Sequence, residues 1–148
     1  MKRILILLFI LLPATLAAQQ GLHIASLFGK ESPLAKRKDV TTILLSGKQV
    51  RTYNLTLFRS VQVGQPTAAD IQQFEKAIKA DIASSNDKQI MKRGERLYYV
   101  FCQLKDLRSG THRYIIYRNK GASSLGGKDL HLIYIEGKAS ANELRSLF

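Results

Sequence analysis

The stretch Arg96–Tyr117 restricts the possible folds more than any other part of the chain. It contains two apolar runs, Arg96–Leu104 and Arg113–Tyr117, separated by the polar segment Lys105–Gly110, which is rich in turn-forming residues. Side chains alternate between the two faces of a strand, and here both alternating sets are largely apolar. A strand with one solvent-exposed face instead alternates apolar with polar residues. The pattern therefore predicts a central β-hairpin that is covered on both faces.

The same alternation assigns side chains of the first strand to faces. In a regular strand Leu97, Tyr99 and Phe101 share one face, while Val100 and Cys102 share the other. Aromatic and β-branched residues of this kind suit a pleated, buried surface. We expect helices on one side of the sheet, and either the N-terminal segment or a partner chain on the other.

The first 18 residues have the order of a secretory signal peptide. Lys2 and Arg3 precede the apolar run Ile4–Leu12, and small residues follow, with a cleavage site expected after Ala17 or Ala18. The run is shorter than the ~20 residues that a membrane-spanning helix needs. We therefore expect an exported protein, periplasmic or secreted, with residues 19–148 as a single domain and no transmembrane span in the mature chain.

The composition of the mature chain limits its chemistry. Cys102 is the only cysteine, so no internal disulfide can form, and its apolar strand indicates a buried thiol. Cleavage after Ala18 removes two of the 23 basic residues, which leaves 21 against 11 acidic residues and a net charge of +10. This charge favours anionic partners such as lipopolysaccharide, nucleic acid or anionic glycans. The alternative interpretation is that the charge serves only solubility.

The rest of the chain supplies further strands. We predict strands over Val40–Leu45, Val50–Val63 and Asp129–Ile135, and a further short strand over Gln89–Lys92. The short apolar segment Leu22–Phe28 fits either a strand or a helix.

Two capping patterns mark the expected helices. Thr67, with Asp70 three residues later, predicts a helix over residues 67–84 whose apolar stripe lies on the sheet. Ser140, with Glu143 three residues later, predicts a short C-terminal helix with an apolar edge formed by Leu144, Leu147 and Phe148. The predicted fold is α+β, a mostly antiparallel sheet of about five strands with both helices on one face.

No set of residues predicts catalysis, a cofactor or a metal site. Cys102 has apolar neighbours, whereas catalytic thiols lie in electropositive and partly exposed sites. His23, His112 and His131 are scattered and never at metal-ligand spacing. The loop Gly121–Lys128 lacks the glycine and the Ser or Thr of a phosphate-binding loop, and a strand follows it where that motif requires a helix.

Six basic residues form the candidate ligand-binding site, which we call the basic rim. They lie at or near the ends of the predicted central strands: Arg93, Arg96, Arg113, Arg118, Lys120 and Lys128. If these ends meet at one border of the sheet, the guanidinium groups and nearby tyrosines are suited to an acidic sugar or a phosphate. The alternative is a solvated border at which Lys and Arg prevent edge-to-edge pairing of sheets.

Five stretches spread over most of the mature chain carry a family resemblance. They are Gly21–Ala25, Tyr53–Ser60, Arg96–Tyr99, Arg113–Asn119 and Leu132–Gly137, the last followed by the short C-terminal helix. Together they resemble a family of small exported proteins of Bacteroidota that carry a domain of unknown function. The resemblance implies a periplasmic or secreted α+β domain, and it brings no known activity, cofactor or catalytic residue.

These observations favour a non-catalytic periplasmic binding or interaction module. Its expected partner is an anionic glycan, a lipid headgroup or another envelope protein, and the sharper version is an acidic ligand at the basic rim. The alternative is a small periplasmic hydrolase or transferase with a dispersed active site, for example His112 with Glu136.

Overall fold

The computed structural model describes residues 21–29, 32–108, 110–122 and 127–148, so the predicted signal peptide lies outside the described residues. The strands are β1 Val40–Ser46, β2 Leu55–Val63, β3 Asp87–Arg93, β4 Arg96–Leu104, β5 His112–Asn119 and β6 Leu130–Gly137. The helices are the 3-10 turns η1 His23–Leu27, η2 Pro33–Lys36 and η3 Lys120–Ala122, and the α-helices α3 Lys48–Arg51, α4 Ala68–Ile82 and α5 Ala141–Arg145.

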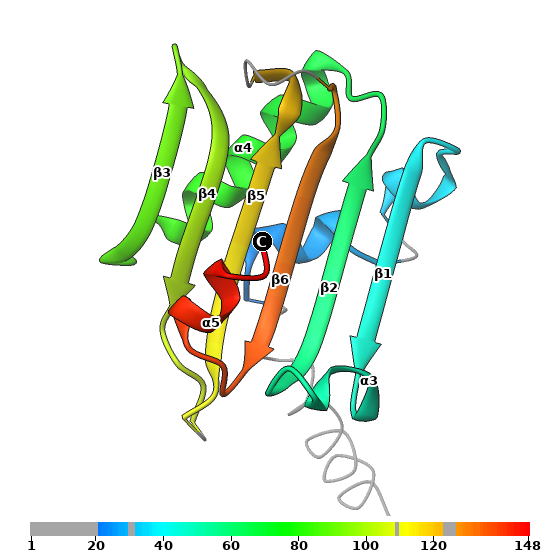
Figure 1. The fold of residues 1–148 in the computed structure, drawn as a ribbon. Helices are drawn as coiled ribbons and strands as arrows, with labels where there is room; N and C mark the ends of the chain where they lie inside the picture. Colours follow the sequence, from blue (N-terminus) through cyan, green and yellow to red (C-terminus); the bar gives the residue numbers. More distant parts are fainter. Residues whose placement is uncertain (1–20, 30–31, 109, 123–126) are drawn as a thin grey trace, which may run out of the picture.

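The strands form one antiparallel sheet in the order β1-β2-β6-β5-β4-β3 (Figure 1). The α+β class and the antiparallel sheet are confirmed, but the sheet has six strands and not about five. The additional strand is β3, because the short strand predicted over residues 89–92 extends to Asp87–Arg93 and pairs along β4. The central hairpin β4–β5 is confirmed, and side chains on both of its faces are fully buried, among them Val100, Tyr114 and Ile115.

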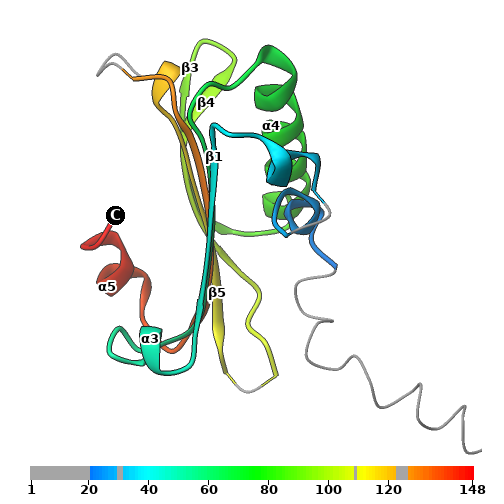
Figure 2. The same ribbon diagram turned by 90° about the vertical axis from the view of Figure 1, so that its right-hand side faces the viewer.

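Helix α4 covers one face of the sheet, which we call the α4 face. Its N-terminus has the full capping box: Asp70 N donates to Thr67 Oγ1 (3.1 Å), and Thr67 N donates to Asp70 Oδ2 (2.8 Å). The helix buries Phe74 and Ile78 among the apolar residues of β2, β4, β5 and β6. The N-terminal turns η1 and η2 lie on this same face (Figure 2).

Helix α5 lies on the opposite face, which we call the α5 face (Figure 2). The prediction that both helices share one face is therefore wrong. Ser140 caps α5 as predicted, and Leu144 is buried against Phe101 and other residues of this face. Leu147 is exposed, contrary to prediction, whereas Phe148 stacks on Phe58 with ring centroids 6.2 Å apart. The expected N-terminal cover also lies elsewhere, because η1 packs with α4.

At two places the structure differs from a regular alternation of side chains along the strands. The β3–β4 register shifts around Tyr98, so Leu97 lies on the α4 face while Tyr99 and Phe101 lie on the α5 face. The predicted extended stretch from Val50 also begins too early, because α3 and a turn precede β2 at Leu55. Asn54 in that turn has a φ of 59°, a conformation that asparagine tolerates better than most residues.

Candidate functional site

The sheet divides the predicted basic rim. Arg93, Arg96, Arg118, Lys120 and Lys128 lie toward the end of the sheet where β3 and β5 finish and β4 and β6 begin. Arg113 lies at the other end, where it is the cross-strand partner of Leu104 and Glu136. Arg113 and Arg118 are five positions apart along β5, about 17 Å of strand. The six residues therefore do not form one rim, and Arg113 is not part of the group.

The five residues at the shared end also differ in direction and pairing. Arg96 turns to the α4 face, where its Nη1 donates to Glu75 Oε2 at 2.8 Å. Lys120 lies 3.8 Å from Asp129, and Arg93 is exposed at the β3–β4 turn. Arg118 alone of these arginines lies on the α5 face, with its guanidinium carbon 5.7 Å from the centre of the Tyr99 ring.

His131 completes the group around Arg118, although the sequence did not single it out for this role. The register of β5 and β6 makes Arg118 and His131 direct cross-strand partners, and Ile116 and Ile133 form the next such pair on the same face. Both residues lie in predicted strands, but the sequence does not give the register of those strands, and the register is needed to place the two side chains opposite each other.

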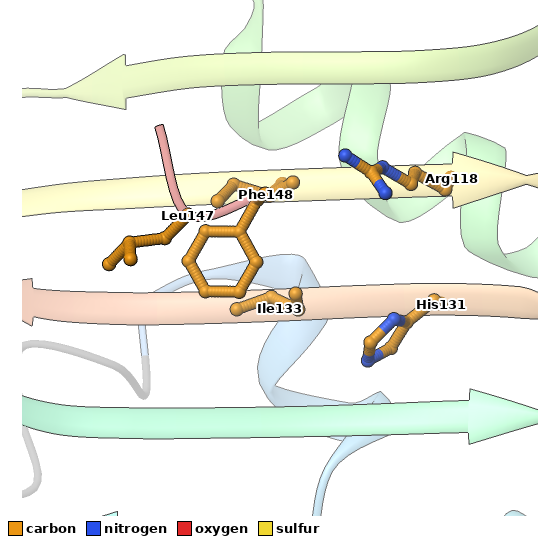
Figure 3. A pocket seen from close by; sticks show the side chains of 6 residues that line it. Arg118, His131, Ile133, Leu147 and Phe148 are labelled. Atoms are coloured by element: carbon orange, nitrogen blue, oxygen red, sulfur yellow. The ribbon is translucent and has the colours of Figure 1, made fainter. Parts of the chain in front are cut away.

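A hollow of about 180 Å³ lies over these two pairs (Figure 3). Arg118 and His131 lie at one end of it, and the Phe148 ring lies over Ile133 at the other. Ile116 and Leu147 complete the lining. Ligand pockets for whole small molecules are about 300–1,000 Å³, so this hollow is sized for one group of a larger ligand. We call it the Arg118–His131 hollow.

The electrostatics of the hollow favour an anion. Burial, together with the positive charges of Arg118 and Lys120, lowers the pKa of His131 below its ordinary value of 6.5. Within the described residues, no carboxylate forms an ion pair or hydrogen bond with Arg118 or His131. Asp129 is close enough to oppose the shift, but its carboxylate is engaged by Gln62 Nε2 (2.9 Å) and Lys120.

A second hollow of about 460 Å³ lies on the α4 side, between α4 and the β3–β4 turn. It is polar, and its lining carries both signs of charge: Glu75, Lys79, Lys92, Gly94, Glu95 and Arg96. Glu75 already accepts hydrogen bonds from Arg96 and from the backbone N of Leu97 (2.7 Å), so the principal carboxylate of this hollow has a structural role.

Two histidines contact carboxylates, but the predicted pair of His112 with Glu136 does not form. His112 lies on the α5 face with its Nδ1 2.9 Å from Asp106 Oδ1, whereas Glu136 lies on the α4 face and accepts from Tyr134 Oη. The suggested pair of His112 with Glu136 is therefore wrong. His23 Nδ1 lies 2.9 Å from Asp81 Oδ1 in the contact between η1 and α4. Neither pair lines the two hollows described above.

Cys102 is fully buried on the α4 face, as predicted, and burial raises the pKa of its thiol. Among the residues that the structure describes, no three His, Cys, Asp or Glu side chains gather as a metal site would require. The same residues include no helix long and apolar enough to cross a membrane.

Comparison with known proteins gives one match. A family of unknown function (DUF6108) matches residues 11–148, which is nearly the whole chain. No curated protein and no solved structure shows significant similarity to the chain. The chain is therefore a member of the DUF6108 family.

Proposed function

We propose that this protein is exported and acts as a non-catalytic binding module, which takes an anionic group of its ligand in the Arg118–His131 hollow. The observation that carries the proposal is the cross-strand pairing of Arg118 with His131 at the mouth of a hollow with an apolar floor. Side chains of like charge directly opposite each other destabilise a sheet. Because its pKa is lowered, His131 is largely neutral at pH 7, and the like-charge cost arises only when the ring takes up a proton. An anion placed between the two side chains offsets that cost and accepts charge-assisted hydrogen bonds from Arg118.

The shape of the hollow specifies the rest of the ligand. Ile116 and Ile133 form the floor, and Phe148 closes one end, so an apolar group next to the anionic group replaces water on these side chains. A carboxylate, phosphate or sulfate with an attached alkyl or ring group has this chemistry. An anionic glycan and a lipid headgroup, the two small-ligand classes that the net charge favours, both belong to it.

The export part of the proposal rests on the N-terminal sequence. The order of basic residues, apolar run and small residues over residues 1–18 is that of a secretory signal peptide. An exported binding module meets acidic glycans and lipid headgroups at the cell envelope. Expression of the full-length gene in its host, followed by fractionation and N-terminal sequencing, tests this part and also decides between cleavage after Ala17 and Ala18.

Octyl phosphate below its micellar concentration is a suitable probe, with octyl glucoside as the neutral control of equal chain length. Isothermal titration of the purified mature protein should give binding of octyl phosphate only. Arg118→Gln should weaken it at least tenfold, since a hydrogen bond to a charged group contributes about 1.5–3 kcal/mol. Arg93→Gln removes the same charge at the same end of the sheet, outside the hollow, and should change the affinity less than twofold.

Two results would contradict the proposal. Equal affinity for octyl glucoside would show that the hollow binds alkyl chains without regard to charge. Equal losses from Arg118→Gln and Arg93→Gln would show general attraction to a basic protein, without a site.

The alternative of a hydrolase or transferase gains no support from the geometry. Neither hollow brings a histidine together with a carboxylate or a nucleophile. The buried thiol of Cys102, with its raised pKa, is also unsuited to nucleophilic attack.

A further inference from the structure

The two edges of the sheet differ in how they are protected. Edge strand β3 carries four charged residues among its seven: Asp87, Lys88, Lys92 and Arg93. Edge strand β1, Val40–Ser46, carries no charged residue and no proline. Charged side chains, lysine above all, and proline are the usual means by which a protein prevents another strand from pairing with its sheet edge. By this measure β3 is protected and β1 is not.

Large apolar side chains of β1 are exposed to solvent, which is typical of a strand that pairs with another chain. Ile43 is 43% exposed and Leu44 is 61% exposed, and they belong to opposite faces of the strand. Thr41 and Thr42 are also exposed. In an antiparallel pairing alternate residues turn their N–H and C=O groups away from the partner, so β1 presents backbone groups outward along the edge. Figure 1 shows β1 as the last strand, with no described strand beyond it.

We propose that β1 is a docking edge at which an extended segment of another polypeptide adds a seventh strand, and that this segment is apolar or β-branched in its centre and acidic at both ends. Strand addition of this kind obtains its affinity from main-chain hydrogen bonds and its specificity from alternate side chains. This site lies at the β1 edge and is independent of the Arg118–His131 hollow, which lies on β5 and β6.

The charges that flank β1 select the occupant. Lys38 lies two residues before the strand and Lys48 two residues after it, and the side chains of both are exposed without an ion pair or hydrogen bond among the described residues. Asp39, directly before the strand, is already paired with Arg37 at 2.9 Å. A second copy of the chain would pair antiparallel about a two-fold axis at Ile43, which matches all seven residues of β1. That arrangement brings the end of β1 near Lys38 in one copy to the end near Lys48 in the other, at both ends of the pairing, and like charges close to each other are unfavourable. Acidic residues at both ends of a partner segment reverse the sign of this interaction.

A labelled nine-residue peptide, Asp-Glu-Val-Thr-Ile-Thr-Val-Glu-Asp with blocked termini, is the probe. Fluorescence anisotropy should show binding that weakens as salt is raised, because the flanking contacts are ionic. Two control peptides separate the contribution of the charged flanks from that of the main-chain hydrogen bonds. The same core with lysine in place of the acidic flanks should bind at least tenfold more weakly, and the probe with N-methylated core amides should not bind.

The two edge strands offer matched variants. Ile43→Glu on β1 and Ile90→Glu on β3 change the same residue type at nearly equal exposure, 43% and 40%. Ile43→Glu should weaken binding of the probe at least tenfold, and Ile90→Glu less than twofold. Arg118→Gln should also leave binding of the probe unchanged within twofold. Because a variant can fail to fold, the wild-type protein supplies a second measurement: hydrogen exchange of the β1 amides should slow when the probe is added, and that of the β3 amides should not.

Several outcomes would overturn the proposal. Equal binding of the N-methylated peptide would mean that charge alone holds the probe. Equal binding of the lysine-flanked peptide would remove the argument from Lys38 and Lys48. A dimer at assay concentration by light scattering, with β1 amides already protected and the dimer lost in Ile43→Glu, would show that a second copy occupies the edge.

Discussion

Asp81→Asn should destabilise the protein through the loss of a buried anchor. The side chain of Asp81 is 2% exposed, and it holds the N-terminal turn η1 against α4. Its Oδ1 accepts from His23 N (2.7 Å) and from His23 Nδ1 (2.9 Å), and its Oδ2 accepts from Ile24 N (2.8 Å). Both backbone donors are satisfied by one carboxylate.

The loss of stability follows from the backbone N–H groups of His23 and Ile24, one of which is left without an acceptor. An asparagine has one oxygen acceptor, so one of the two backbone N–H groups then faces an NH₂ group. A buried donor without an acceptor costs about 1–3 kcal/mol, and the remaining bond loses its charged acceptor. We expect Asp81→Asn to cost about 2–4 kcal/mol, a large share of the roughly 5–15 kcal/mol that stabilises a domain.

Two variants control for the ion pair itself. Asp106 makes the same 2.9 Å contact with His112, but its side chain is 44% exposed. Asp106→Asn should therefore change the free energy of unfolding by less than about 0.5 kcal/mol, as surface substitutions do. The side chain of His23 is 66% exposed, so His23→Ala should cost less than about 1 kcal/mol because solvent screens the pair.

Urea unfolding followed by circular dichroism measures these differences, since ΔG is obtained from the midpoint and the slope m. The expected order of loss is Asp81→Asn, then His23→Ala, then Asp106→Asn, with m unchanged. An Asp81→Asn protein within about 1 kcal/mol of wild type, or no less stable than Asp106→Asn, would refute the claim that this carboxylate anchors η1.

Three further predictions use other parts of the structure. On a polyanion column Arg118→Ala should elute at lower salt than Arg113→Ala, because Arg113 lies at the other end of the sheet and its Nε is bound to a backbone carbonyl; equal elution would contradict this. The lowered pKa of His131 means that below pH 6.5 the unfolded chain binds a proton that the folded one resists, so the free energy of unfolding should fall as pH drops below 6.5, and less steeply in His131→Asn. Gly137→Ala should cost about 1–3 kcal/mol by urea unfolding, since its Cβ would lie 2.6 Å from a backbone Cα of β2, whereas Gly21→Ala meets nothing within 4 Å and should be neutral.

Local chemistry explains what the sequence predicted well. The hairpin β4–β5 is recognisable because its apolar residues occupy both alternating sets, and a strand in the middle of a covered sheet is the structure that uses both. The start of α4 is recognisable because the capping box at Thr67 needs only residues within one turn. Burial of Cys102 follows from its place in the hairpin.

Long-range geometry explains what the sequence did not predict. Nothing within α5 encodes which face it covers, since that depends on the path of the chain after β6. The register shift at Tyr98 reverses the face of Leu97, and a one-residue shift of this kind leaves no mark in the alternation. The arrangement of the six basic residues could not be predicted for the same reason, because only the register pairs Arg118 with His131 and separates both from Arg113.

The binding of an anionic group at the Arg118–His131 hollow is the central claim. An NMR titration with octyl phosphate of ¹⁵N-labelled protein that begins at residue 19 tests it most directly. We predict that the largest shift changes fall on Ile116, Arg118, His131 and Ile133, that they saturate together, and that the His131 ring signals move toward the protonated form. Changes spread over the basic surface without saturation, or centred on Arg113 at the opposite end of the sheet, would contradict the account.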